Sequence, residues 1–302
     1  KADCKRVLQD ELNVRSVELV DAQRLYDLEL KPHFKALGPV PPLEIVAHRI
    51  LWSTLLLAPL IQARRAWQSV LAVLFDRQLR WGLAASTLLI ASNWFAYVLA
   101  VTSGNVLDAS LGYFLCPLVN VALGVAFLKE RLSQRQTAAV ALAAAAVLML
   151  IVALGVVPKT ALFLAISFGL YGLVRKRLPV DPATALFLEC ALLIPAGMAI
   201  TLWLAAAGDL RTLDGDPWTL LLLMLSGFVT VVPLLLFGMG AKRLRLSTIG
   251  VLQYIAPSML FIEGVLWFGE PLNPWRLAAF IMIWGALVIY SLEGVMAPRR
   301  AS

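Results

Sequence analysis

Polar and charged side chains inside otherwise apolar stretches are the residues of this sequence that could do chemistry. Arg49 and Glu189 are the charged ones, His48 adjoins Arg49, and Asn93 precedes Trp94. Asn93 lies roughly 18 Å into its stretch if each helical residue adds about 1.5 Å. Such groups are costly in hydrocarbon unless they meet a partner or a cavity. Each therefore predicts a contact between helices or a substrate contact, and for Asn93 both remain open.

One stretch, 107–128, also places small and polar side chains on a single helical face. The four residues, separated by four, three and four positions, are Tyr113, Pro117, Asn120 and Gly124. A shift of 140 residues turns them into Gln253, Pro257, Leu260 and Gly264, with Tyr254 beside the first. We expect the two stripes to line a central cavity together with Arg49, Asn93 and Glu189. Close helix packing through Gly and Pro is the alternative.

Charged groups buried in a membrane need partners. Arg49 lies about 9 Å below the outer edge of its stretch at ~1.5 Å per residue, and Glu263 is the partner that we expect for it. Arg175 or Lys176 is the expected partner of Glu189. For both Arg49 and Glu189, the alternative is that the side chain extends toward the lipid headgroups.

The composition indicates that a bilayer must hold these side chains in place. Hydrophobic residues make up 60% of the 302 and charged residues 15%, where soluble proteins have about a quarter charged. The mean hydropathy of +0.81 leaves too few polar groups to cover a globule. A large domain outside the membrane is therefore excluded.

Several kinds of chemistry lack their sequence patterns. The three cysteines and two histidines lie far apart, so we expect neither a disulfide framework nor a metal site. The sequence contains no phosphate-binding loop, dinucleotide fingerprint or nucleophile elbow, so we expect no cofactor and no ATP-driven pumping by this chain. A membrane-embedded enzyme would need His, Asp or Cys pairs clustered at helical spacing, and we find none.

Nine apolar stretches are long enough to be membrane-spanning helices. They are 43–61, 81–103, 107–128, 137–155, 158–174, 182–206, 218–241, 246–268 and 274–293. The number of basic residues alternates between successive connections, with 15 Lys or Arg on one side of the membrane and three on the other. The three include Lys159 and Arg276, which lie at the ends of their spans and are counted with the adjacent connections. The positive-inside rule then predicts a multi-pass membrane protein with 175–181 and the C-terminus in the cytoplasm. Because topology explains the basic excess, no nucleic-acid partner is expected.

The second half of the sequence repeats the first at a shift of 140 residues. Residues 107–132, reading LDASLGYFLCPLVNVALGVAFLKERL, fall on 247–272 with a Pro, a Gly, a Glu and a Leu in matching positions. A unit of five helices is odd in number, which gives the two units opposite orientations, as in many secondary transporters. We therefore predict an all-α polytopic fold built as an inverted repeat, with units at 39–156 and 157–302.

The repeat fails at one place. The shift carries 158–174 onto 18–34, but that segment, ELVDAQRLYDLELKPHF, is too charged to cross a bilayer. We therefore predict nine transmembrane helices in place of ten. The first helix is expected to be missing, and residues 1–38 to be a polar segment foreign to the membrane fold.

Five segments carry a family resemblance. They are HRILWS at 48–53, NW at 93–94, ASLGYFLCPLVN at 109–120, YGLVRKRL at 171–178 and RLRLSTIGVLQYIAPSMLF at 243–261. In these segments, and from about residue 36 to its end, the chain resembles the RarD subfamily of the EamA branch of the drug/metabolite transporter superfamily. The resemblance implies an inner-membrane permease with ten helices in a five-plus-five inverted repeat.

Residues 1–38 are similar to a different protein. LQDELNVRSVELVDAQRLYDLELKPHFKALG is similar to a segment near the C-terminus of isoleucyl-tRNA synthetases. This similarity implies a chimeric N-terminus joined within the FKALG at 34–38, and a natural soluble extension is the alternative. We expect a chain that lacks one wall of its cavity to transport poorly, and to improve when residues 1–35 are replaced by about twenty apolar residues.

The inverted repeat and the polar residues near the membrane midplane predict a secondary transporter that works by alternating access. The resemblance implies that it moves a small organic metabolite or drug across the inner membrane. Its expected partners are the small-molecule substrate and the lipid bilayer, and a homodimer is left open. The alternative is a membrane-embedded protein without transport activity, either a scaffold or a broken fusion. A membrane-embedded enzyme ranks below both.

Overall fold

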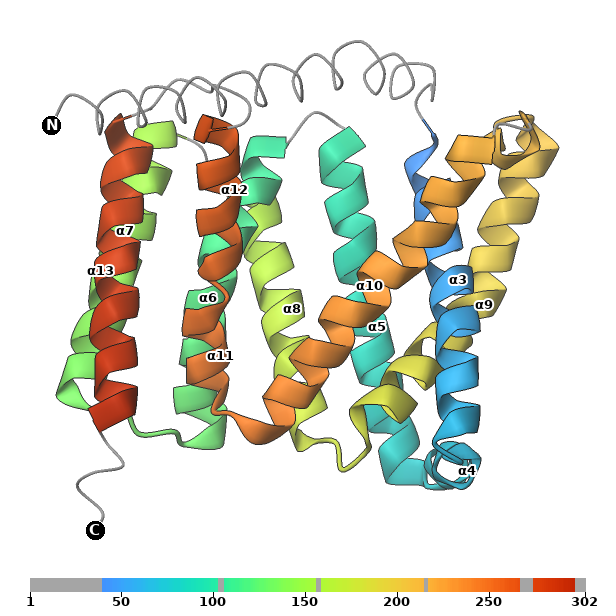
Figure 1. The fold of residues 1–302 in the computed structure, drawn as a ribbon, viewed down its shortest axis with the longest axis horizontal. Coiled ribbons are helices and arrows are strands. Elements are labelled where there is room, and N and C mark those ends of the chain that lie inside the picture. Colours follow the sequence, from blue (N-terminus) through green and yellow to red (C-terminus); the bar gives the residue numbers. More distant parts are fainter. Residues whose placement is uncertain (1–39, 103–105, 156–158, 215–216, 267–273, 297–302) are drawn as a thin grey trace, which may run out of the picture.

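The computed structural model describes residues 40–102, 106–155, 159–214, 217–266 and 274–296. Their regular elements are all helices, most of them upright and roughly parallel, with α10 crossing obliquely (Figure 1). The first half contains α3 (Pro42–Ala63), α4 (Trp67–Phe75), α5 (Arg77–Thr102), α6 (Val106–Leu128) and α7 (Gln134–Leu154). The second half contains α8 (Lys159–Arg177), α9 (Pro182–Ala207), η2 (Arg211–Asp214), α10 (Pro217–Arg243), α11 (Leu246–Leu252), α12 (Ile255–Leu266) and α13 (Pro274–Met296).

The described helices make this a polytopic all-α membrane protein, as predicted. Seven of them are long and apolar enough to cross a membrane, namely α3, α5, α6, α7, α9, α10 and α13. The predicted span 158–174 forms α8, which stands among the others but ends in three basic residues (Figure 1). The segment 18–34, where the repeat calls for one more span, lies outside the described residues, as do all of residues 1–38.

The structure divides the predicted span 246–268 into two helices, α11 and α12, with the break at Gln253 and Tyr254. Pro257 explains the division. It has no N–H to donate, and its ring clashes with the carbonyl of residue 253 in a regular helix. The backbone tightens instead, with the N–H of Ala256 donating to the Gln253 carbonyl at 3.2 Å.

The predicted connection 62–80 contains a short helix, α4, which the sequence pattern does not predict because charged residues flank it on both sides. Figure 1 shows α4 end-on below α3, so it lies across the direction of the other helices. Trp67, Leu71 and Phe75, spaced by four residues, expose one apolar face, while Val70 and Val73 are buried. A short amphipathic helix in this orientation is typical of the membrane interface.

Three pairs of helices related by the shift of 140 residues pack directly against each other. They are α3 with α9, α6 with α11, and α7 with α13. When a helix touches its own repeat counterpart, the axis that relates the two halves must pass between the two. The packing therefore agrees with the inverted repeat that the sequence predicts.

Two glycines allow the closest of the helix contacts between the halves. A Cβ on Gly250 of α11 would lie 2.6 Å from the carbonyl oxygen of Pro117 in α6. A Cβ on Gly227 of α10 would lie 2.6 Å from the Cβ of Trp52 in α3. Real Cβ atoms do not approach other atoms so closely, so both positions need a residue without one.

Candidate functional site

Arg49 is the most distinctive polar residue inside the bundle. It lies on α3, half-buried, and its Nε donates a hydrogen bond of 2.9 Å to Thr230 Oγ1 on α10. Its Cζ lies 4.7 Å from the centroid of the Trp94 ring on α5, which is a cation–π contact. The structure thus brings together two of the predicted site residues, Arg49 and Trp94.

Two tyrosines extend this contact to a fourth helix. Tyr97 of α5 and Tyr113 of α6 have ring centroids 6.4 Å apart, and both lie within electrostatic reach of Arg49. Their exposed fractions, 36% and 41%, leave them accessible from outside the packed core. We name the set Arg49, Trp94, Tyr97, Tyr113 and Thr230 the Arg49 cluster.

The Arg49 cluster has the chemistry of a binding site for a planar polar molecule. A guanidinium offers paired N–H donors to an acceptor or an anion, and aromatic rings offer stacking faces. No hydrogen bond or ion pair joins Arg49 to an Asp or Glu in the part of the chain that the structure describes. The side chain of Glu263, its predicted partner, lies outside the described residues, and its helix α12 stands well away from α3 in Figure 1.

Glu189 and Arg175 form a buried ion pair. The Arg175 Nη1 lies 3.6 Å from the Glu189 carboxylate, and both side chains are at most 2% exposed. The Glu189 carboxylate also accepts hydrogen bonds from Ser86 at 2.6 Å and from the hydroxyl of Tyr171 at 3.1 Å. Lys176, the other predicted partner, donates to the carbonyls of Ala241 and Leu244 instead. The network joins α5, α8 and α9.

Asn93 is used for a contact between helices in this structure. Its Nδ2 donates to the Leu164 carbonyl and to Ser167 Oγ, both at 2.9 Å and both on α8. The side chain therefore bridges α5 and α8, which is one of the two roles that the sequence left open.

Asn120 and Gln253 bond to each other across the contact between α6 and α11. The Asn120 Nδ2 lies 2.5 Å from the Gln253 Oε1, and Asn120 is fully buried. The hydroxyl of Tyr254 donates to the Phe114 carbonyl at 3.2 Å. Asn120, Gln253 and Tyr254 thus make their hydrogen bonds between packed helices, although the buried Oδ1 of Asn120 has no partner there. Tyr113, from the same predicted stripe, faces Tyr97. The stripes do not present one continuous polar surface.

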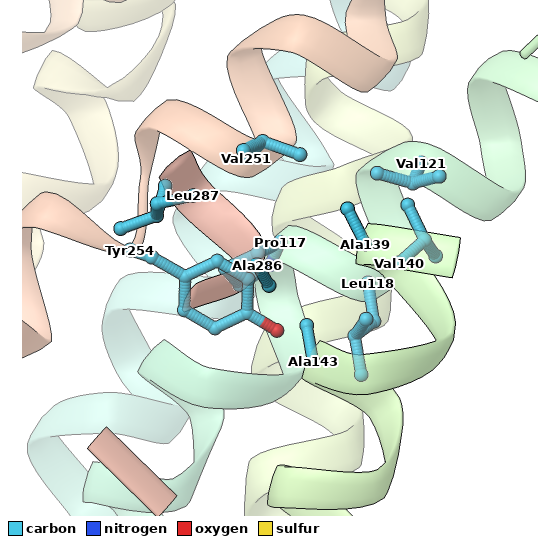
Figure 2. A pocket seen from close by; sticks show the side chains of 10 residues that line it. All are labelled: Pro117, Leu118, Val121, Ala139, Val140, Ala143, Val251, Tyr254, Ala286 and Leu287. Atoms are coloured by element: carbon cyan, nitrogen blue, oxygen red, sulfur yellow. The ribbon is translucent and has the colours of Figure 1, made fainter. Parts of the chain in front are cut away.

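A small pocket beside these residues is too small for a substrate. Its lining, shown in Figure 2, is Pro117, Leu118, Val121, Ala139, Val140, Ala143, Val251, Tyr254, Ala286 and Leu287. Its volume of about 10 Å³ is close to the minimum for a single water molecule. We therefore regard it as a packing defect between α6, α7, α11 and α13.

His48 belongs to a polar contact near the start of α3. Its Nε2 lies 2.9 Å from Thr212 Oγ1, and the indole N–H of Trp52 donates to its Nδ1 at 3.1 Å. Glu44, one turn before it, is fully buried and accepts backbone N–H bonds from Arg211 and Thr212. This contact fastens η2, in the connection from α9 to α10, onto α3.

Glu130, between α6 and α7, caps α11 at the opposite end of the bundle. Its carboxylate accepts bonds from the N–H groups of Leu246 at 2.7 Å and Ser247 at 3.0 Å, and from the Ser247 hydroxyl at 2.6 Å. Partial burial alone would raise its pKa. The hydrogen bonds from Ser247 and Leu246, helped by the charge of Lys176, outweigh burial and lower the pKa below its usual value of 4.5.

Several partners of the predicted site residues had not been identified from the sequence. They are Thr230, Tyr97, Ser86, Tyr171 and Thr212. Except for Thr212, which lies in the connection from α9 to α10, the available signal is a hydroxyl inside a long apolar run. Such a hydroxyl marks a polar group that needs a partner but does not say which helix supplies that partner. Among the described residues, no three His, Cys, Asp or Glu side chains are close enough together to hold a metal ion.

A duplicated bundle of membrane-spanning helices, with polar contacts buried between its halves, defines a polytopic membrane transporter. The EamA-like transporter family matches this chain twice, over residues 35–152 and 159–292, so the chain belongs to that family. It is 46% identical to an uncharacterized transporter of Vibrio cholerae serotype O1, and 89% of each chain is covered. It is 40% identical to the protein RarD of Escherichia coli K12, over 89% of this chain and 91% of the relative.

A more distant relative agrees with this assignment, and a solved structure shares the fold. The chain is 31% identical to the chloramphenicol-sensitive protein RarD of Pseudomonas aeruginosa, over 87% of this chain and 89% of the relative. A solved structure titled only "Crystal structure of protein" superposes with a TM-score of 0.63 at 19% identity. It covers 87% of this chain and 92% of its own, which shows a shared fold.

Proposed function

We propose that this protein is a secondary transporter that moves a small organic metabolite or drug across the inner membrane by alternating access. The observation that carries the proposal is the duplicated family match together with the direct packing of α3 on α9, α6 on α11 and α7 on α13. Two similar halves of opposite orientation can rock about the contacts near their common axis, which is how many such transporters expose one site to either side in turn.

The moving units in this proposal are residues 39–156 and 157–302, with residues 1–38 outside them. The Arg49 cluster is the proposed substrate contact, because it joins helices of both units and keeps two partly exposed aromatic rings beside a cation. The other predicted site residues have a supporting role, since they hold neighbouring helices together. They are His48, Asn93, Asn120, Glu189, Gln253 and Tyr254.

The polar ties at the two ends of the bundle support a proposal for its state. We call the end of the bundle where α8 and α10 end in basic residues the basic end. There Lys176 donates to carbonyls at the end of α10, and Arg177 donates to the Phe127 carbonyl of α6. Glu130 accepts a hydrogen bond from the start of α11. At the other end, Glu44 and His48 of α3 tie that helix to η2. We infer that this state is closed at the basic end, which the positive-inside rule assigns to the cytoplasm together with the C-terminus.

Flux measured with the purified protein in liposomes tests the proposal. Radiolabelled chloramphenicol is a suitable first probe, because the name of one relative contains it, and a panel of aromatic acids and amines extends the test. We expect saturable uptake above that of protein-free liposomes for at least one probe, and sensitivity to an imposed ion gradient. Folded protein that gives no flux above empty liposomes across the panel would favour the non-transporting scaffold.

A further inference from the structure

A pocket of about 270 Å³ lies where α3 ends, α9 begins and α10 ends. It is separate from the Arg49 cluster and belongs to the basic end of the bundle. Its charged lining residues are Arg64, Asp181, Lys242 and Arg243, so that three cations face one carboxylate. Its apolar lining includes Leu235 and Met239 of α10. We name it the basic-end pocket.

The carboxylate in this pocket is already engaged. Asp181 caps α9 by accepting the N–H groups of Ala183 at 3.0 Å and Thr184 at 3.2 Å, and it lies 3.9 Å from Arg64. The cations keep donors to spare. The ammonium of Lys242 bonds to the Leu178 carbonyl, which uses one of its three N–H groups, and Arg243 is exposed. The pocket therefore has a net positive charge, and its cations keep N–H donors that Asp181 does not occupy.

An apolar stripe on α10 continues from the pocket along the helix. Its members, separated by three or four residues, are Leu225, Val229, Val232, Leu236 and Met239. All are between 37% and 67% exposed, and this spacing places them on one helical face. Met239 both ends the stripe and lines the pocket. A molecule with an anionic head and an apolar tail could place its head in the pocket and its tail along the stripe.

Aromatic side chains mark this end of the bundle as the level of the lipid headgroups. Trp67 of α4 is 41% exposed and packs edge-on against Phe187 of α9, with ring centroids 5.6 Å apart. Exposed Trp is typical of the boundary between hydrocarbon and water. The basic-end pocket, at the start of the same α9, therefore lies where phosphate groups of a bilayer are found.

We propose that the basic-end pocket binds the phosphodiester headgroup of an anionic phospholipid, with an acyl chain along the α10 stripe. Basic pockets between the ends of membrane helices recognise such headgroups through charge and hydrogen bonds. The volume is below the roughly 300 Å³ at which pockets for drug-sized ligands begin, so it suits a headgroup alone. A soluble phosphate ester has no apolar chain that could contact Leu235, Met239 and the stripe. The apolar surface therefore favours a lipid as the molecule that carries the phosphate.

The test measures lipid binding to the full-length protein in detergent by native mass spectrometry. The probes are a phosphatidylglycerol and a phosphatidylcholine with the same acyl chains, so that the two differ only in headgroup. The variants are Lys242→Gln with Arg243→Gln, and Arg243→Gln alone in case loss of the Lys242 bond to Leu178 disturbs folding. Arg131→Gln with Arg135→Gln is the matched control, because it removes two exposed charges from the same end of the bundle.

We expect the wild type to prefer phosphatidylglycerol, the double variant to bind it about tenfold more weakly, and the control to stay within about twofold of the wild type. Arg243→Gln alone should show a smaller loss in the same direction. Lys242→Arg, which keeps the charge, should bind phosphatidylglycerol as the wild type does. Equal binding of the two lipids, or an equal loss in the control, would overturn the proposal. Displacement of phosphatidylglycerol by millimolar glycerol 3-phosphate would show that the pocket takes soluble phosphate esters and would overturn the lipid assignment.

Discussion

Arg49 carries a positive charge among helices that cross the membrane, and its described contacts are a hydroxyl and an aromatic face. Hydrogen bonds to charged groups contribute about 1.5–3 kcal/mol, and about 1.4 kcal/mol is a tenfold change in an equilibrium constant. We therefore expect Arg49→Gln to lower the flux of an anionic probe by tenfold or more. Arg49→Lys keeps the charge without the planar fork and should give an intermediate rate.

Liposome flux at subsaturating probe measures this difference, with Arg135→Gln as the control for loss of one surface cation. Equal flux in wild type and Arg49→Gln would show that Arg49 makes no contact with the substrate, even if the protein transports.

Glu189 has a different consequence, because it is the partner of a buried arginine. Removing one member of a buried ion pair leaves the other charge uncompensated, at a cost of about 3–5 kcal/mol. Glu189→Gln should therefore lower the thermal unfolding temperature markedly. Glu293→Gln is the matched comparison. Its partner is Arg135, whose Nη1 lies 3.3 Å from the Glu293 Oε2 and whose side chain is 60% exposed. An ion pair at the surface contributes at most about 1 kcal/mol. A similar small effect of both changes would mean that Arg175 finds other compensation.

At the scale of elements, the contact between α6 and α11 depends on Gly250. A Cβ there would meet the Pro117 carbonyl at 2.6 Å and the Asn120 Cβ at 3.0 Å, so Gly250→Ala must push the helices apart. We expect a loss of about 1–3 kcal/mol in unfolding free energy, as for other overpacked sites. Gly285→Ala on α13 is the control, since its Cβ would meet only Leu142 at 3.8 Å. Tolerance of both changes would argue against close packing at α11.

The cap of α11 gives a dependence on pH. Since the folded state lowers the pKa of Glu130 below 4.5, its carboxylate contributes stability above that pH, and the contribution is lost as the pH falls through the lowered pKa. Unfolding temperatures of purified protein measured between about pH 7 and about pH 3 should therefore fall less steeply in Glu130→Gln than in the wild type. Parallel curves for the two proteins would show that the cap does not couple to folding.

Helix positions were predictable because the thickness of a bilayer fixes how long an apolar stretch must be. The break at Gln253 was not, because Pro117, at the matching position of the first repeat, sits inside an unbroken α6. Whether a proline bends or divides a membrane helix depends on which neighbouring groups satisfy the carbonyl that it leaves free. A single sequence does not show which groups those are. The partners Thr230 and Tyr97 escaped prediction for the same reason, since hydropathy gives no order of helices around the bundle.

At the scale of the whole molecule, the orientation in the membrane is the simplest prediction to check. A cysteine in place of exposed Asp209 should react with a membrane-impermeant reagent added outside intact cells, and one in place of exposed Arg177 should not. Cys4, Cys116 and Cys190 are replaced beforehand. The reverse labelling pattern would invert the topology, and with it the side to which we assign the closed end.

For the proposed transport cycle, the unequal packing of the two halves predicts the geometry of a second state. Helix α10 packs extensively on α3, whereas its counterpart α5 has a smaller contact with α9. Two copies of one fold can exchange their conformations, so that each half takes the shape that the other has here. In that exchange α5 would close onto α9, and α10 would draw away from α3 so that Gly227 leaves Trp52. In the proposed transport cycle, the first half would then take the arrangement that the second half has here, and the second half that of the first.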